Sequence, residues 1–218
     1  MSGLRLILIG APGSGKGSQA VEISKQLGVA HLSTGDMLRA ERANGSELGK
    51  LAQGYMDKGE LVPDNVIIDM MKTRLQLSDC KNGYILDGFP RTVVQATAME
   101  QAGIDVDRVI LLEVPDEIII DRLGGREVCS SKGCGSTYHI KNKMPNKAGI
   151  CDECGGALIK RPDDNPQTVK NRLETYHEQT KPVLEHYRQQ GKLLEVNGVG
   201  TVDDVRARVL EALNQRFN

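Results

Sequence analysis

The sequence lacks an excess of charge of either sign. Its 218 residues include 28 Lys and Arg against 29 Asp and Glu, for a net charge of −1. Without a basic excess, nothing global in the chain points to a nucleic acid or an acidic membrane surface as a partner. Any recognition of anions must therefore come from local groups of residues.

Long apolar runs are also missing, since no stretch approaches the ~18 residues that a membrane-spanning helix needs. The segment from Met1 to Arg5 leads directly into a strand-like run and is too short for a signal peptide. We therefore expect a soluble, cytoplasmic protein. A chain of 218 residues with 39% hydrophobic content allows one main domain with an insertion, or two small domains.

Cysteine is scarce and unevenly placed. Cys80 stands alone, and the other four, Cys129, Cys134, Cys151 and Cys154, form a C-x4-C pair followed by a C-x2-C pair. In a reducing compartment this clustering favours a metal over disulfides. Four thiolates suit tetrahedral Zn²⁺ and leave no open position for chemistry, so we expect a structural site. Four metal-free thiols are the alternative, and His139 is a competing ligand.

A glycine-rich loop follows the first apolar run: Gly10-Ala11-Pro12-Gly13-Ser14-Gly15-Lys16-Gly17-Ser18. Its glycines can turn successive N–H groups into one concavity, and Lys16 adds a positive charge. The helix expected from about Gly15 places its positive dipole end beneath the same phosphates. The loop fits the template G-x-x-x-x-G-K-[ST], except that the hydroxyl moves from position 17 to Ser18. It predicts a site for the phosphates of a nucleoside triphosphate.

Four strand-like apolar runs alternate with helical patterns along the chain. They are Leu4–Ile9, Tyr84–Leu86, Val109–Val114 and Leu193–Val196. Such alternation indicates a parallel sheet covered by helices on both faces. Together with the glycine-rich loop, it predicts an α/β fold of the P-loop NTPase class.

Two segments interrupt this alternation. Residues 33–62 hold two short helical patterns, with Ser46 as an N-cap and Gly59 as a stop. Residues 124–164 turn toward Gly, Lys, Cys and other polar residues, which indicates a second compact unit inserted into the core. Further helices are expected from Asp64 to about Leu77, from about Gln167 toward Gln189, and at 202–213.

The run at Tyr84 ends in Asp87-Gly88-Phe89-Pro90-Arg91. Ligands of parallel α/β sheets bind at the carboxyl ends of strands, so Asp87 is placed to orient Mg²⁺ or its water ligands beside the loop. Arg91 has a planar guanidinium that suits a phosphate. A helix-capping aspartate and a solvated arginine are the simpler alternatives.

The stretch from Leu32 to Arg39 reads LSTGDMLR, a helix start with a Ser/Thr cap. Together with GAPGSGKG, LVPD at Leu61 and LDGFPRT at Leu86, it resembles the adenylate kinases, whose characteristic motifs stand here in the same order. The segments 121–126 (DRLGGR) and 160–164 (KRPDD) fit the same pattern, so the resemblance covers essentially the whole chain. The chain departs from it at Ser18, where Thr is usual, in the wider first cysteine pair, and at Glu127, where a second Arg is common.

The resemblance implies Mg²⁺-dependent transfer of the terminal phosphoryl group of ATP to AMP, giving two ADP, by a monomer without a covalent intermediate. The catalytic residues it implies are Lys16, Asp87, Arg91, Arg126, Arg161 and Arg172. ATP would be held by Gly13, Ser14, Gly15, Lys16, Gly17, Ser18, Arg122, Arg126, Thr137, Tyr138 and Gly200. AMP would be held by Thr34, Gly35, Arg39, Glu60, Leu61, Val62, Gly88, Phe89, Pro90, Arg91, Gln95, Arg161 and Arg172.

The same resemblance divides the chain into three parts. Residues 1–32, 63–124 and 164–218 would form the core, 33–62 an NMP-binding flap, and 125–163 a lid that carries the zinc site. Phosphoryl transfer needs positioned nucleotides, positive charge and exclusion of water, and two mobile flaps would meet the last need.

Three alternatives remain at this point. One is a kinase for another nucleoside monophosphate, such as UMP or CMP; the resemblance disfavours it because Thr34, Gln95 and the long lid match the adenylate kinases. A GTPase is disfavoured because no N-K-x-D run stands near a strand end. The cysteine segment could instead be a zinc ribbon that binds RNA through Lys132, Lys141, Lys143, Lys147 and Lys160, but its one aromatic residue, Tyr138, offers little base stacking.

Overall fold

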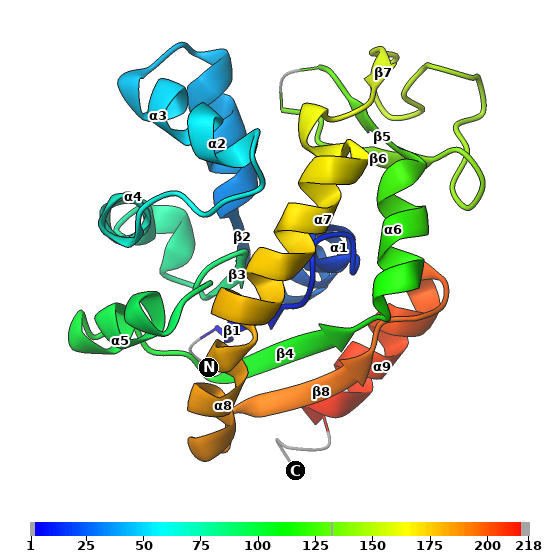
Figure 1. Ribbon diagram of the computed structural model, residues 1–218. Coiled ribbons are helices and arrows are strands. Elements are labelled where there is room, and N and C mark those ends of the chain that lie inside the picture. Colours follow the sequence, from blue (N-terminus) through cyan, green and yellow to red (C-terminus); the bar gives the residue numbers. More distant parts are fainter. Residues whose placement is uncertain (1–2, 132, 215–218) are drawn as a thin grey trace.

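A parallel five-stranded sheet forms the centre of the computed structural model, which describes residues 3–131 and 133–214 (Figure 1). The strands lie in the order β2-β3-β1-β4-β8. They are β1 (Arg5–Ile9), β2 (Ala30–Ser33), β3 (Tyr84–Asp87), β4 (Arg108–Glu113) and β8 (Leu193–Asn197), and each neighbouring pair is parallel. The predicted α/β fold with a parallel sheet is confirmed.

Helices cover both faces of this sheet, so successive residues of its central strand are buried on opposite sides. Leu6 and Leu8 of β1 pack with α1 (Lys16–Leu27) and α9 (Val202–Asn214). Ile7 and Ile9 face the cluster formed with α4 (Asp64–Leu75), α5 (Val93–Gln101) and α8 (Pro182–Gln189). All four side chains are at most 3% exposed, which explains why this strand is apolar throughout.

The segment 33–62 forms two helices that project from the β2 edge of the sheet (Figure 1). Ser46 caps α3 (Glu47–Met56) by accepting from Gly49 N at 3.0 Å, as predicted. A Cβ at Gly49 would lie 2.3 Å from Glu41 O, so α3 crosses α2 (Thr34–Ala43) at close range. Gly59 adopts a φ of 80° after α3 and ends the helical pair.

The cysteine-rich segment forms a small antiparallel sheet in the order β6-β5-β7, from β5 (Arg126–Cys129), β6 (Thr137–His139) and β7 (Leu158–Ile159). It stands at the far end of α6 (Asp116–Gly124), beside the start of α7 (Pro166–Thr175) (Figure 1). The chain thus enters this small sheet from α6 and leaves it toward α7.

Local structure differs from the sequence-based expectations in three places. Strand β2 was not predicted, because its four residues are too few to show a pattern. The helix at Asp64 ends at Leu75, and a 3₁₀ turn follows at Ser78–Cys80. The single helix expected toward Gln189 is interrupted by a π turn at Tyr176–Thr180, where Lys181 N donates to Tyr176 O at 2.8 Å because Pro182 has no N–H with which to continue an α-helix. No helix in the described part of the chain is long and apolar enough to cross a membrane.

Candidate active site

The glycine-rich loop joins β1 to α1 at the carboxyl edge of the sheet. Gly13 and Gly15 adopt φ values of 84° and 97°, which favour glycine. A Cβ at Gly13 would lie 2.8 Å from Leu123 Cγ, so the loop also packs closely against α6. Because α1 begins at Lys16, the free N–H groups of its first turn border the loop.

Lys16 lies folded into the loop. Its Nζ donates to Gly10 O at 2.7 Å and to Ala11 O at 2.9 Å. The pKa of Lys16 is lowered to about 8, chiefly by burial; Asp87 opposes this shift, whereas the positive charge of Arg91 and Arg172 contributes to it. The ammonium is thus held where more negative charge would stabilise it.

Asp87 is the last residue of β3 and is 9% exposed. The carboxylate faces the loop, because a Cβ at Gly17 would lie 3.4 Å from Asp87 Oδ2. His31 Nε2 lies 3.6 Å from the same oxygen, a neighbour that the sequence did not indicate. Carboxylate and hydroxyl oxygens, here Asp87 and Ser18, are the donors that Mg²⁺ prefers, so this donor set fits the predicted role.

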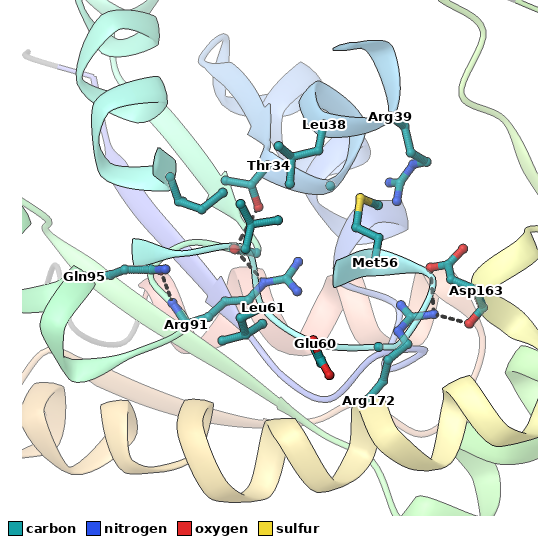
Figure 2. A pocket seen from close by; sticks show the side chains of 15 residues that line it. Thr34, Leu38, Arg39, Met56, Glu60, Leu61, Arg91, Gln95, Asp163 and Arg172 are labelled. Carbon is teal, nitrogen blue, oxygen red and sulfur yellow. Dashed lines mark hydrogen bonds and ion pairs between the residues drawn. The ribbon is translucent and has the colours of Figure 1, made fainter. Parts of the chain in front are cut away.

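A smaller pocket lies between the segment 33–62, the residues that follow β3, and α7 (Figure 2). Thr34 Oγ1 donates to Gly88 O at 2.8 Å, and Arg91 Nε donates to the same oxygen at 2.8 Å. Gln95 Oε1 accepts from Arg91 N at 2.7 Å, and Gln95 Nε2 donates to Asp64 Oδ1 at 2.8 Å. These contacts bring the start of α2, the loop after β3 and the start of α5 to one site.

Two adjacent carboxylates join the lid to α7. Arg126 binds Asp164 with two hydrogen bonds, the longer of them 2.7 Å from Nε. Arg172 Nη1 lies 2.9 Å from Asp163 Oδ2 and 3.1 Å from Asp164 Oδ1. The Asp164 side chain is 4% exposed. In the sequence, both aspartates stand out only as part of the KRPDD segment; their contacts with the two arginines depend on β5 and α7 lying side by side in the fold.

Positive charge exceeds negative charge around this junction. Burial lowers the pKa of Arg161 to about 10, with Arg39 and Arg126 adding to the effect. Arg161 Nε is buried without a hydrogen-bond partner among the described residues. Burial and the charge of Arg172 likewise lower the pKa of Arg91 to about 10. Several guanidinium groups and one ammonium thus converge on a space that suits an anion such as phosphate.

The structure brings nearly all of the predicted binding residues together. Every residue expected to hold ATP lines one large cleft between the loop, the lid and the segment 198–206. The residues expected to hold AMP line that cleft or the smaller pocket, except Phe89, which is 1% exposed and packs in the core. Tyr138 is 4% exposed, and its hydroxyl accepts a hydrogen bond from Asp152 N at 2.8 Å, so most of its ring is buried within the lid.

Apolar side chains that the sequence reasoning missed complete the smaller pocket. They are Leu38, Met56 and Ile67, from α2, α3 and α4. Each occupies a position at which helices commonly carry a core residue, so the sequence does not distinguish these pocket residues from residues of the hydrophobic core. Such a wall suits the flat face of a nucleobase.

The four lid cysteines converge as predicted. Their Sγ atoms all lie within 4.8 Å of one another, with 3.4 Å between Cys129 and Cys154 and 3.6 Å between Cys134 and Cys151. A tetrahedral Zn²⁺ with bonds of about 2.3 Å places its sulfur ligands roughly 3.8 Å apart. Gly135 and Gly155, which follow the second cysteine of each pair, adopt φ values of 67° and 72° and let the chain bend there. This donor set fits zinc.

His139 does not compete for that metal. Its Nδ1 accepts from the backbone N–H groups of Lys141 and Asn142 at 3.1 and 3.2 Å, and its Nε2 lies 3.2 Å from Asp121 O. The imidazole therefore ties the lid to α6. Cys80 lies apart from the cluster, beside Arg74, as a buried thiol.

Comparisons with known proteins agree with this geometry. A model of the adenylate kinase family matches residues 8–192. The adenylate kinase of Caldicellulosiruptor saccharolyticus is 50% identical over 214 residues, covering 96% of this chain and 99% of its own. That of Lachnospira eligens is 51% identical over 214 residues (96% and 100%), and that of Streptomyces avermitilis is 44% identical over 216 residues (97% and 98%). The predicted resemblance is confirmed, and the chain belongs to the adenylate kinase family.

Proposed function

We propose that this chain catalyses the reversible, Mg²⁺-dependent transfer of the terminal phosphoryl group of ATP to AMP, giving two ADP. The observation that carries the proposal is that two binding spaces share one charged wall: Gly88, Arg91 and Arg172 line both the large cleft and the smaller pocket. An enzyme that only hydrolyses ATP needs no second pocket. Here the second pocket adjoins the cleft that the glycine-rich loop lines.

The reaction needs little covalent work from side chains. A phosphate oxygen of AMP attacks the γ-phosphorus of ATP, and the bond from that phosphorus to the β–γ bridging oxygen breaks, which releases ADP. Lys16 would hold the β- and γ-phosphates, and Arg91 with Arg39 would hold the phosphate of AMP. Arg126, Arg161 and Arg172 would stabilise the charge on the transferring group. Asp87 and Ser18 would hold the Mg²⁺ that enters with ATP, and this metal would neutralise phosphate charge.

Exclusion of water would come from two moving parts. We infer that residues 33–62 form the flap over AMP and residues 125–163 the lid over ATP, on a core formed by 1–32, 63–124 and 164–218. Arg122 supports a hinge at the lid, since its guanidinium donates to Ser14 O at 3.3 Å and to Gly198 O at 3.1 Å. The lid can thus turn about a point fixed to both the loop and the segment after β8.

An acceptor panel tests the proposed substrate. Purified protein with Mg-ATP should phosphorylate AMP at least about tenfold more efficiently than CMP or UMP, because the pocket offers Gln95 and Thr34 beside an apolar wall on which the larger face of a purine can pack. The measurement is kcat/KM for each acceptor in a coupled assay. Ready phosphorylation of CMP or UMP with no ADP formed from AMP would assign the chain to another nucleoside monophosphate.

We infer a structural Zn²⁺ in the lid, held by Cys129, Cys134, Cys151 and Cys154. Protein purified without chelators should contain about one zinc per chain by elemental analysis, and stripping the metal should lower the unfolding temperature, because the lid has only a small apolar core of its own. Replacing Cys80 by Ser should leave the zinc content unchanged, whereas Cys151→Ser should reduce it. Metal-free protein whose unfolding is unchanged by EDTA would refute this site.

We also infer a monomer that acts on free nucleotides in the cytoplasm, without nucleic-acid or membrane partners. Two of the lid lysines lie beside other groups: Lys141 Nζ lies 3.3 Å from Asp121 Oδ1, and Lys143 Nζ lies 5.4 Å from the centre of the Tyr138 ring. Lys132 lies outside the described residues. Tyr138, the one aromatic residue of this segment, is 4% exposed and so offers little surface for base stacking, which speaks against the zinc-ribbon alternative.

A further inference from the structure

Gln19 is a buried amide at the edge of the large cleft. It lies near the start of α1, one residue beyond Ser18, and is 2% exposed. It lines the cleft together with Gly198, Gly200 and Val202. None of the roles described above uses it.

The two ends of this amide differ. Nε2 donates to Val202 O at 2.8 Å, which anchors α1 to the start of α9. Oε1 is buried and has no hydrogen-bond partner among the described residues. Turning the amide over would place Oε1 against the Val202 carbonyl, two acceptors in contact, so the anchor fixes the orientation. A buried acceptor without a donor is costly, and such an atom calls for an explanation.

The nucleotide expected in this cleft can supply the missing donor. The loop and the start of α1 hold phosphates, so the nucleoside must lie beyond them, toward the segment 198–206 that lines the same cleft. The triphosphate carries only acceptors, whereas adenosine carries three donor groups: the exocyclic N6 amine and the ribose 2′- and 3′-hydroxyls. A buried amide oxygen at this point favours a ligand that presents a donor and disfavours one that presents an acceptor.

We propose that Gln19 Oε1 accepts a hydrogen bond from the nucleoside of the donor ATP, so that Gln19 determines donor specificity. This inference rests on the proposed function, because it requires ATP in the large cleft. Gln19 contributes nothing to the transferring phosphoryl group. Its effect belongs in the recognition of the donor nucleotide.

The test pairs one substitution with three analogues, each lacking one donor: purine riboside triphosphate, 2′-deoxy-ATP and 3′-deoxy-ATP. Gln19→Met keeps the length of the side chain and removes the acceptor. The wild type should lose about tenfold in kcat/KM with one analogue. With ATP, the kcat/KM of Gln19→Met should be lower than that of the wild type by a similar factor. Changing from ATP to that analogue should then lower the kcat/KM of the variant almost no further. Such coupling distinguishes recognition of the nucleoside from a general displacement of the site by the substitution. A displacement would lower kcat/KM for ATP and for every analogue by the same factor.

Two controls accompany this cycle. The KM for AMP should not change in Gln19→Met, and Ser24→Ala, in the same helix but away from the cleft, should treat ATP and the analogues as the wild type does. Equal use of ATP and all three analogues by the wild type would overturn the inference even if the variant failed to fold. The inference would also be overturned if the substitution Gln19→Met lowered kcat/KM by the same factor for ATP and for every analogue. If the wild type formed no ADP from ATP and AMP, the proposed function itself would fail.

Discussion

Replacing Lys16 by methionine is expected to lower kcat/KM by about 10³-fold, because the only ammonium at the phosphate loop among the described residues would be lost where phosphate charge develops. The fold should survive, since the ammonium contacts only loop oxygens and its burial is unfavourable. Steady-state kinetics and circular dichroism check both parts. Near-normal turnover in the variant would contradict the assigned role.

The pH profile provides the control for this substitution. Because burial and neighbouring arginines lower the pKa of Lys16 to about 8, the free wild-type enzyme loses this charge as the pH rises above 8. We therefore expect kcat/KM for ATP to fall by about tenfold between pH 8 and pH 9.5, where only a few per cent of Lys16 remains protonated. Lys16→Met should lack this decrease. A decrease of equal size in the variant would assign the titration to another group.

Replacing Asp164 by alanine is expected to lower the free energy of unfolding by about 3 kcal/mol. The substitution leaves Arg126 and Arg172 in a buried site already rich in positive charge, where Asp163 remains as the ion-pair partner of Arg172. Urea unfolding followed by circular dichroism measures the loss. A mixture of ATP and AMP without Mg²⁺ should stabilise the variant more than the wild type, because bound phosphates would replace the missing negative charge.

The matched control is Asp105→Ala, which breaks an exposed pair with Arg5 at 3.3 Å. Its Asp side chain is 74% exposed, so the loss should stay below about 1 kcal/mol. Equal losses in the two variants would show that Asp164 does not balance buried charge. In that case the junction between the lid and α7 would be an ordinary surface contact.

Sequence reasoning succeeded where one local segment carries both the pattern and its physical cause. Three features each lie within about ten residues, so that spacing alone indicates their geometry: the glycines of the phosphate loop, the Ser46 cap, and each of the two cysteine pairs. It missed β2, whose four residues show no period, and the π turn, which depends on one missing N–H at Pro182.

The charged junction could not be predicted in the same way. Arg126 and Asp164 are 38 positions apart in the sequence, and only the return of the chain from the lid to α7 brings them together. Gln19 shows the same limit, because its partner Val202 lies 183 positions away. Nothing in the sequence indicates that Asp164 or Gln19 is buried. Their roles follow from burial and from which atoms remain unpaired.

Full product accounting in one reaction tests the central claim most directly. Purified protein, Mg-ATP and AMP are mixed, and ATP, AMP, ADP and inorganic phosphate are measured over time. The account predicts two ADP formed for each ATP and each AMP consumed, without release of phosphate, because the group passes between two sites that share one charged wall. Consumption of ATP with release of inorganic phosphate, and with AMP unchanged, would contradict it.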